Sequence, residues 1–186
     1  MRRSRYIGVS ILCLFFFLVL AIAFVSSDLS ATMIIGGENS VGEWMSGVLL
    51  VISATVTAVD ALRRGWRPWM IFSLFFILLA VDENFMIHEA IKRHIVFSSF
   101  EKTNHPIYWI GELPVILAAC FGAVVAWMLW KNIDKGIRWL IPAGVIFEIA
   151  SVTIDVMSAG VLWEDSLKLI GELCVTSALG YDVQKQ

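Results

Sequence analysis

The chain has 186 residues, of which 59% are hydrophobic and only 16% are charged, and its mean hydropathy is +0.80. A soluble domain carries about a quarter charged residues, so this composition excludes an ordinary soluble protein and predicts an all-α integral membrane protein. The net charge of −2 gives no indication of a nucleic-acid partner, and the three cysteines lack the spacing of a disulfide or thiol redox centre.

Six apolar stretches are each close to the roughly 20 residues that a helix needs to cross a bilayer. They predict a single integral membrane domain over residues 1–186, built as a six-transmembrane-helix bundle. The first stretch is longer than the roughly 7–15 apolar residues of a signal peptide, so we expect a membrane helix there. In chain order, the expected helices are 7–26, 43–62, 69–91, 107–130, 139–160 and 161–181.

Lysine and arginine predict the orientation of this bundle, because cytoplasmic loops carry an excess of both. In a six-span chain most of the basic residues fall on one side of the membrane, which places both termini in the cytoplasm (N-in, C-in). We therefore expect a multi-pass protein of the plasma or cell inner membrane. The residues on this side are Arg2, Arg3, Arg5, Arg63, Arg64, Arg67, Lys131, Lys135, Arg138 and Lys185, with Trp66, Trp69, Trp130 and Trp139 marking the inner helix ends.

Most acidic residues of the last four expected helices lie in their outer halves, and Glu148 lies near the middle of its helix. An ionised side chain at the bilayer centre costs at least ~2.5–3.5 kcal/mol, so these groups must be paired, hydrated, protonated or metal-bound. At about 100° per residue, several of them share a helix face. The pattern predicts an acidic polar chamber, open to the extracytoplasmic side. Its two main stripes are Glu164, Lys168 and Glu172 on 161–181, and Glu148, Ser151 and Asp155 on 139–160.

A divalent metal ion is one expected occupant, because carboxylates and an imidazole from several helices can bind zinc, manganese or iron. The segment differs from the di-metal carboxylate template, since the chain contains no Glu-x-x-His. His88 also lies about 120° around the helix from Asp82, so it faces the chamber only if the helix ends nearby. The alternative for this histidine is an interfacial position. The candidate ligands are Asp82, Glu83, His88, Glu89 and Glu112.

Three functions fit these observations. The first is a membrane-embedded, metal-dependent enzyme acting on a lipid-like substrate, in which Glu148, Asp155 and Glu172 supply a general acid and base. The second is a proton- or cation-coupled transporter or channel subunit, with Lys168 as an internal counter-ion. The cytoplasmic halves of the spans, however, offer no matching polar path. The third is a non-catalytic subunit or assembly factor, whose charged faces bind other membrane subunits or fix helix register.

Overall fold

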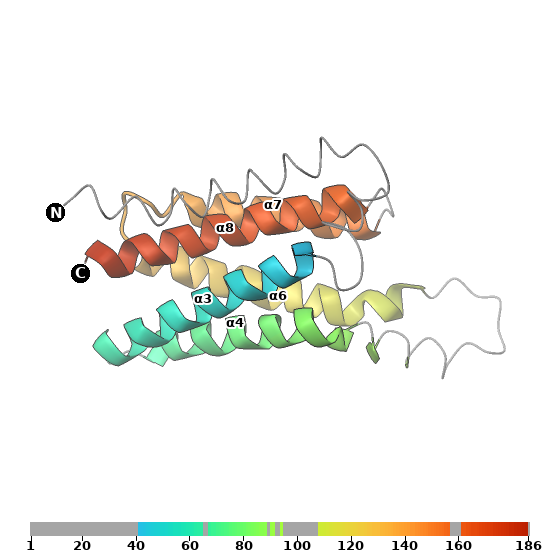
Figure 1. Cartoon of the computed structure of the whole chain (residues 1–186), viewed down its shortest axis with the longest axis horizontal. Helices are drawn as coiled ribbons and strands as arrows, with labels where there is room; N and C mark the ends of the chain where they lie inside the picture. Colours follow the sequence, from blue (N-terminus) through green and yellow to red (C-terminus); the bar gives the residue numbers. More distant parts are fainter. Residues whose placement is uncertain are drawn as a thin grey trace.

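The computed structural model describes residues 41–64, 67–88, 90–91, 94, 108–156 and 161–185 (Figure 1). Over these residues the chain is all-α, with five helices and no strand. The helix expected at 7–26 lies outside the described residues, while each of the other five expected segments contains a helix. The helices are α3 (Val41–Arg64), α4 (Arg67–Phe85), α6 (Tyr108–Asn132), α7 (Leu140–Val156) and α8 (Val161–Lys185).

The ends of α3 and α4 follow from local chemistry. Glu43 lies in the first turn of α3 and Arg64 in its last turn, and both charges complement the helix dipole. The helix expected at 69–91 ends early, at Phe85, because Met86 adopts the left-handed conformation with φ of 50°. This conformation interrupts the helical hydrogen-bond ladder and redirects the chain at the end of α4.

The helices pack in a chain of neighbours (Figure 1). Helix α3 packs against α4 on one side and α8 on the other, and α8 packs against α7. Helix α6 makes smaller contacts with α7 and α4. The α3–α4 and α7–α8 pairs are antiparallel hairpins, whereas α3 and α8, which are remote in sequence, run parallel. The contact between α3 and α8 therefore joins the two hairpins.

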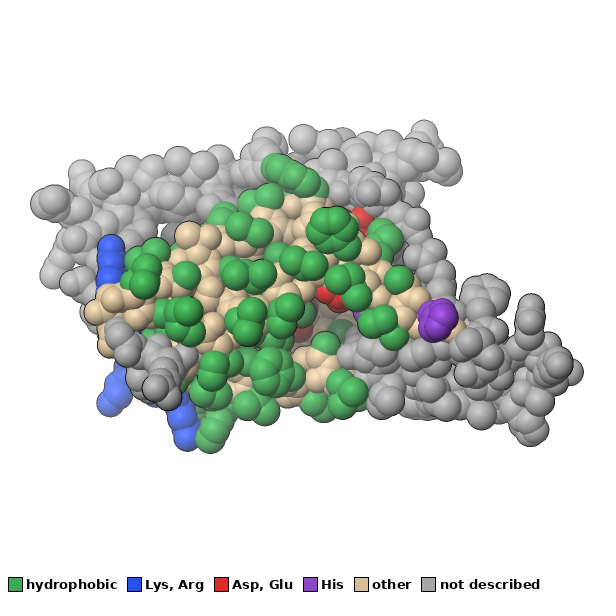
Figure 2. Space-filling view, turned by 90° about the horizontal axis from the view of Figure 1, so that it is seen from below, with side chains coloured by type: hydrophobic (Ala, Val, Ile, Leu, Met, Phe, Trp, Pro, Cys, Tyr) green, Lys and Arg blue, Asp and Glu red, His purple; other side chains and the backbone are tan. Residues whose placement is uncertain are grey.

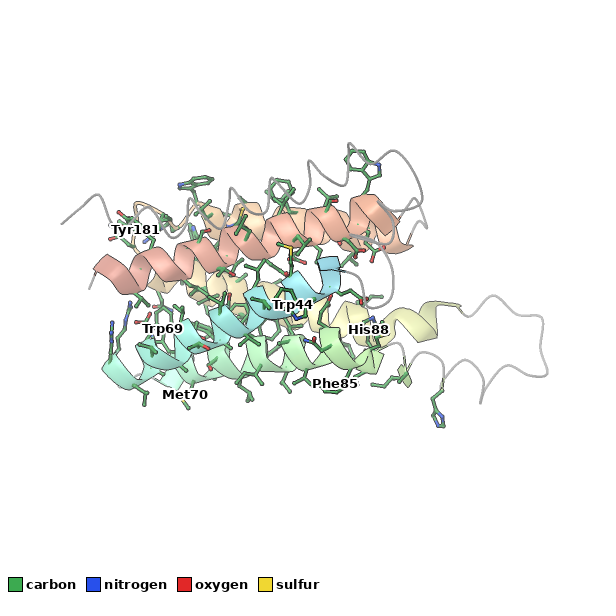
Figure 3. All side chains as sticks on the ribbon, viewed as in Figure 1. Trp44, Trp69, Met70, Phe85, His88 and Tyr181 are labelled. Carbon is green, nitrogen blue, oxygen red and sulfur yellow. The ribbon has the colours of Figure 1, made fainter. Side chains whose placement is uncertain are left out.

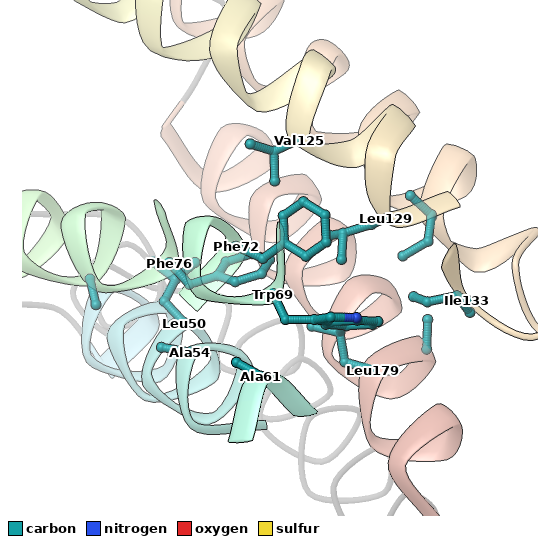
Figure 4. Close-up of a cluster of buried hydrophobic side chains, with 13 residues drawn as sticks. Leu50, Ala54, Ala61, Trp69, Phe72, Phe76, Val125, Leu129, Ile133 and Leu179 are labelled. Atoms are coloured by element: carbon teal, nitrogen blue, oxygen red, sulfur yellow. The ribbon is translucent and has the colours of Figure 1, made fainter. Parts of the chain in front are cut away.

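The largest buried apolar cluster brings together side chains from α3, α4, α6, α7 and α8 (Figure 4). Small residues on α3, such as Ala54, leave room for the aromatic rings of α4. Trp69 and Phe72 are fully buried there and meet edge to face, with ring centroids 5.5 Å apart. The sequence predicts that Trp69 marks the inner end of a membrane helix, and the structure buries its indole in this core near the start of α4.

Apolar side chains also cover the outside of the bundle (Figure 2). Two of the described helical segments, Gly42–Arg64 and Pro68–Phe85, are long and apolar enough to cross a membrane. Ile116–Asn132 and Leu140–Ile154 are shorter apolar helices. A surface of this kind suits a lipid environment. The exposed residues on α4 are Met70, Ile71, Leu74, Ile77, Leu78, Val81 and Phe85.

Candidate functional site: a buried carboxylate–lysine cluster

Helices α4, α7 and α8 bring four charged side chains together. We call Glu83, Glu148, Lys168 and Glu172 the carboxylate–lysine cluster. Lys168 Nζ donates a hydrogen bond to Glu83 Oε2, which ties α8 to α4. Ser46 of α3 donates to Glu172 Oε1 over 2.6 Å. The cluster therefore connects both hairpins through charged or charge-assisted bonds.

Glycine at position 171 makes room for Glu148. A β carbon added to Gly171 would lie 2.7 Å from Glu148 Oε1 and 2.9 Å from the carbonyl oxygen of Gly144. The missing side chain lets α7 approach α8 closely and lets the Glu148 carboxylate lie over the α8 backbone. In this position Glu148 interacts electrostatically with Glu172, Lys168 and Glu83.

The cluster has an excess of negative groups, since three carboxylates share one ammonium group. Glu172 is only 7% exposed, and its Oε2 accepts no hydrogen bond from any residue that the structure describes. A buried carboxylate oxygen without a donor is costly. The arrangement can therefore take up protons or a cation.

Asp82 and His88 form a separate pair at the end of α4, where Figure 3 shows His88. Asp82 Oδ1 accepts the backbone N–H of His88 over 2.8 Å, and Asp82 Oδ2 lies 2.9 Å from His88 Nδ1. The left-handed Met86 makes the contact possible, since it ends α4 before His88. From the sequence, His88 was expected to face the chamber only if the helix ends nearby; α4 does end at Phe85, and His88 then contacts Asp82 rather than the carboxylate–lysine cluster.

The sequence-derived candidates thus divide into several groups. Glu83, Glu148, Lys168 and Glu172 come together, whereas Asp82 and His88 form their own pair. Ser151 is buried on α7, and Glu164 is half-buried near the start of α8. The side chains of Glu89, Glu112 and Asp155 lie outside the described residues. Within the described part of the chain, no three His, Cys, Asp or Glu side chains form a group that could hold a metal ion.

A second charged cluster lies at the opposite end of the α3–α8 contact. We call Asp60, Arg64 and Asp182 the Arg64 cluster. Arg64 Nη2 donates to Asp182 Oδ2 and lies 3.3 Å from Asp60 Oδ2. Asp182 Oδ1 also accepts the backbone N–H of Asp134 over 2.9 Å. These bonds join the ends of α3 and α8 to the turn between α6 and α7.

Buried hydroxyl groups lie between the two clusters. We call this row of Ser53, Thr57 and Thr176 the α3–α8 seam. Ser53 Oγ and Thr176 Oγ1 are 2.8 Å apart, and Thr57 Oγ1 donates to the Ser53 carbonyl oxygen over 2.8 Å. From the sequence, no polar path was expected in the half of the spans that contains Arg64, but the structure places these buried hydroxyls there. The signal was present, because Ser46, Ser53, Thr57 and Asp60 recur at helical spacing on one face of α3.

A sequence model of one protein family matches residues 5–183 of this chain. The chain belongs to that family. The family is described as Domain of unknown function (DUF8692), and the matched range contains both charged clusters and the α3–α8 seam. No curated protein and no solved structure matches the chain.

Proposed function

We propose that this chain is a six-span integral membrane protein of the plasma or inner membrane, with both termini in the cytoplasm. In this proposal the carboxylate–lysine cluster binds a cation that enters from the extracytoplasmic side. The two long apolar helices support the membrane location. The basic residues support the orientation, since Arg64 at the end of α3 and Lys135 in the turn after α6 lie at the same end of the bundle.

The observation that carries the proposal is the charge of the cluster together with its burial. Three carboxylates face Lys168, whose ammonium group already donates to Glu83. Glu172 Oε2 is left without a donor among the described residues. An added cation near Glu172 and Glu148 supplies the missing positive charge. Oxygen ligands favour a hard cation such as Na⁺, Mg²⁺ or Mn²⁺.

Of the three functions considered from the sequence, cation-coupled transport is the one that the seam supports best. A polar row that reaches the opposite end of the bundle suits a conducting protein better than a chamber closed at one end. The metal-dependent enzyme acting on a lipid-like substrate stays a prediction, because it requires Glu89, Glu112 or Asp155 as a further ligand or catalytic group. The role as a partner-binding subunit or assembly factor also stays a prediction.

Cation titration of detergent-purified protein tests the proposal. We expect saturable binding of Mn²⁺ or Na⁺ by isothermal titration calorimetry, at least tenfold weaker in Glu172→Gln and in Glu148→Gln, which corresponds to about 1.4 kcal/mol. Glu43→Gln is the matched control, because this carboxylate lies on α3 outside the cluster. Absence of binding in the wild type, or equal affinity in Glu172→Gln, would overturn the proposal.

A further inference from the structure

Asp60 is the most deeply buried acid among the residues that the structure describes, with an exposed fraction of 0%. Its nearest charged partner is Arg64, at 3.3 Å, but neither Asp60 carboxylate oxygen accepts a hydrogen bond from the described residues. The guanidinium instead donates to Asp182 and stacks over the Trp69 ring, with Arg64 Cζ 4.5 Å from the ring centroid. Arg64 therefore hydrogen-bonds to Asp182, whereas its contact with Asp60 is only an ion pair.

Counting charges identifies Asp60 as the group that holds a proton. Two buried carboxylates share one half-buried guanidinium, and the neighbouring Arg63 is exposed on the outside of α3. Asp182 accepts hydrogen bonds from Arg64 and from the Asp134 backbone, which favour its ionised form. Asp60 has no such bond, and a proton removes the cost of burying its charge.

The hydroxyl groups of the α3–α8 seam lie between Asp60 and the carboxylate–lysine cluster. Ser and Thr hydroxyls both donate and accept hydrogen bonds. Glu172 accepts from Ser46, and Thr176 lies one turn further along α8 in contact with Ser53. Successive groups on one helix are about 5.4 Å apart along its axis, a gap that one water molecule can bridge.

We propose that the α3–α8 seam is a proton route with Asp60 as its second proton-binding group. The inference rests on the proposed cation site. When a cation binds near Glu172, the O–H bond of protonated Glu172 breaks and its proton passes through the hydroxyl row. The O–H bond of Asp60 breaks as its own proton leaves at the Arg64 end, a new O–H bond then forms on Asp60, and no electrons are exchanged with any other group. Cation binding at one end of the seam is thereby coupled to proton release at the other end.

Proton flux in proteoliposomes containing the full chain tests this route. A potassium diffusion potential set with valinomycin drives the flux, and a pH-sensitive dye inside the vesicles records it. We expect Asp60→Asn to lose at least nine-tenths of the wild-type flux, and Ser53→Ala and Thr57→Val to lower it several-fold. Thr55→Val is the matched control, because Thr55 is exposed on α3 and bonds only within its own helix to Val51. Its flux should equal that of the wild type.

Two further measurements separate the route from the cation site. Infrared difference spectra of the wild type should contain a protonated-carboxyl band that is missing in Asp60→Asn. This measurement does not depend on the size of the proton flux. If Mn²⁺ or Na⁺ binds normally but the wild type passes no protons, the route is wrong and the cation site stands. The route would also be overturned if the proton flux stayed at the wild-type level in Asp60→Asn, Ser53→Ala or Thr57→Val. Absence of the carboxyl band in the wild type would overturn it as well. If Asp60→Asn fails to fold, the seam variants decide.

Discussion

Gly144 and Gly171 face each other across the α7–α8 contact so closely that neither position has room for a side chain. A β carbon on Gly144 would lie 2.8 Å from the Gly171 carbonyl oxygen, and one on Gly171 would lie 2.9 Å from the Gly144 carbonyl oxygen. These neighbours are backbone atoms, so a clash can be relieved only by moving a helix. Close approach through small residues is a common way for membrane helices to associate.

The first prediction is that Gly144→Ala and Gly171→Ala each destabilise the protein by ~1–3 kcal/mol, because overpacking forces α7 away from α8. Gly180→Ala is the control on α8, since a β carbon there meets no atom within 4 Å. The midpoint of thermal unfolding in detergent measures the effect. Equal midpoints for Gly171→Ala and Gly180→Ala would contradict the packing argument.

The second prediction concerns Met86, whose left-handed conformation costs ~1–2 kcal/mol in a residue with a β carbon. Met86→Gly should preserve or raise the unfolding midpoint, because glycine adopts this conformation without strain. Met70→Gly, at an exposed helical position of α4, should instead cost ~1 kcal/mol. The prediction is wrong if the two glycine substitutions have the same effect on thermal unfolding.

The third prediction is that Arg64→Ala costs ~3 kcal/mol or more, because it leaves the buried, ionised Asp182 without its cation. The double variant Asp182→Asn with Arg64→Ala should recover much of that loss, since the orphaned Asp182 charge is then gone. Arg63→Ala is the control and should stay within ~0.5 kcal/mol of the wild type. Thermal unfolding of all three variants checks the result, and an Arg63→Ala effect as large as that of Arg64→Ala would refute it.

The fourth prediction tests Lys168 as an internal counter-ion. Lys168→Gln should bind Mn²⁺ more tightly, by about tenfold or 1.4 kcal/mol, because the added cation no longer competes with the ammonium group. Lys131→Gln is the control, since Lys131 is exposed on α6 and lies over the Trp127 ring. Calorimetric titration at constant pH makes the comparison. Weaker binding in Lys168→Gln would mean that Lys168 holds the site together rather than balancing its charge.

The fifth prediction concerns the six-span topology. In a variant without Cys13, Cys120 and Cys174, a cysteine at position 104 should react with a membrane-impermeant maleimide in intact cells. A cysteine at position 135 should react only after the membrane is opened. The proposed topology has one span between these two positions. If both positions react from the same side, the number of spans between them is even and the topology is wrong.

Helical periodicity predicted much of the carboxylate–lysine cluster from the sequence. The four-residue spacing of Lys168 and Glu172 placed both on one face of α8, and Glu148 was expected to share their interior. On α4 both Asp82 and Glu83 were expected as ligands in one chamber, but Glu83 bonds to Lys168 while Asp82 pairs with His88. Side-chain length and rotamer are not encoded in a helical projection.

Other features could not be predicted from the patterns that we used. Met86 ends α4 without glycine or proline, so no local signal marked the break. Asp60 and Arg64 have the spacing of an ion pair within one helix, but Arg64 was interpreted only as a marker of the cytoplasmic side. Its bond to Asp182 joins residues 118 positions apart, and such a contact depends on how the hairpins pack.

The parallel α3–α8 contact also determines the order in which the protein can assemble. Its polar bonds join Ser46 to Glu172 and Ser53 to Thr176, across 126 and 123 positions of the chain. Helix α8 follows α3 in the chain, so in the proposed topology α3 enters the bilayer while Ser46 and Ser53 still lack their partners on α8. Lipid cannot supply the missing hydrogen bonds. We therefore expect α3 to stay at the protein-lined exit of the insertion machinery until α8 has been made. A chain truncated before α8 should be degraded by membrane proteases.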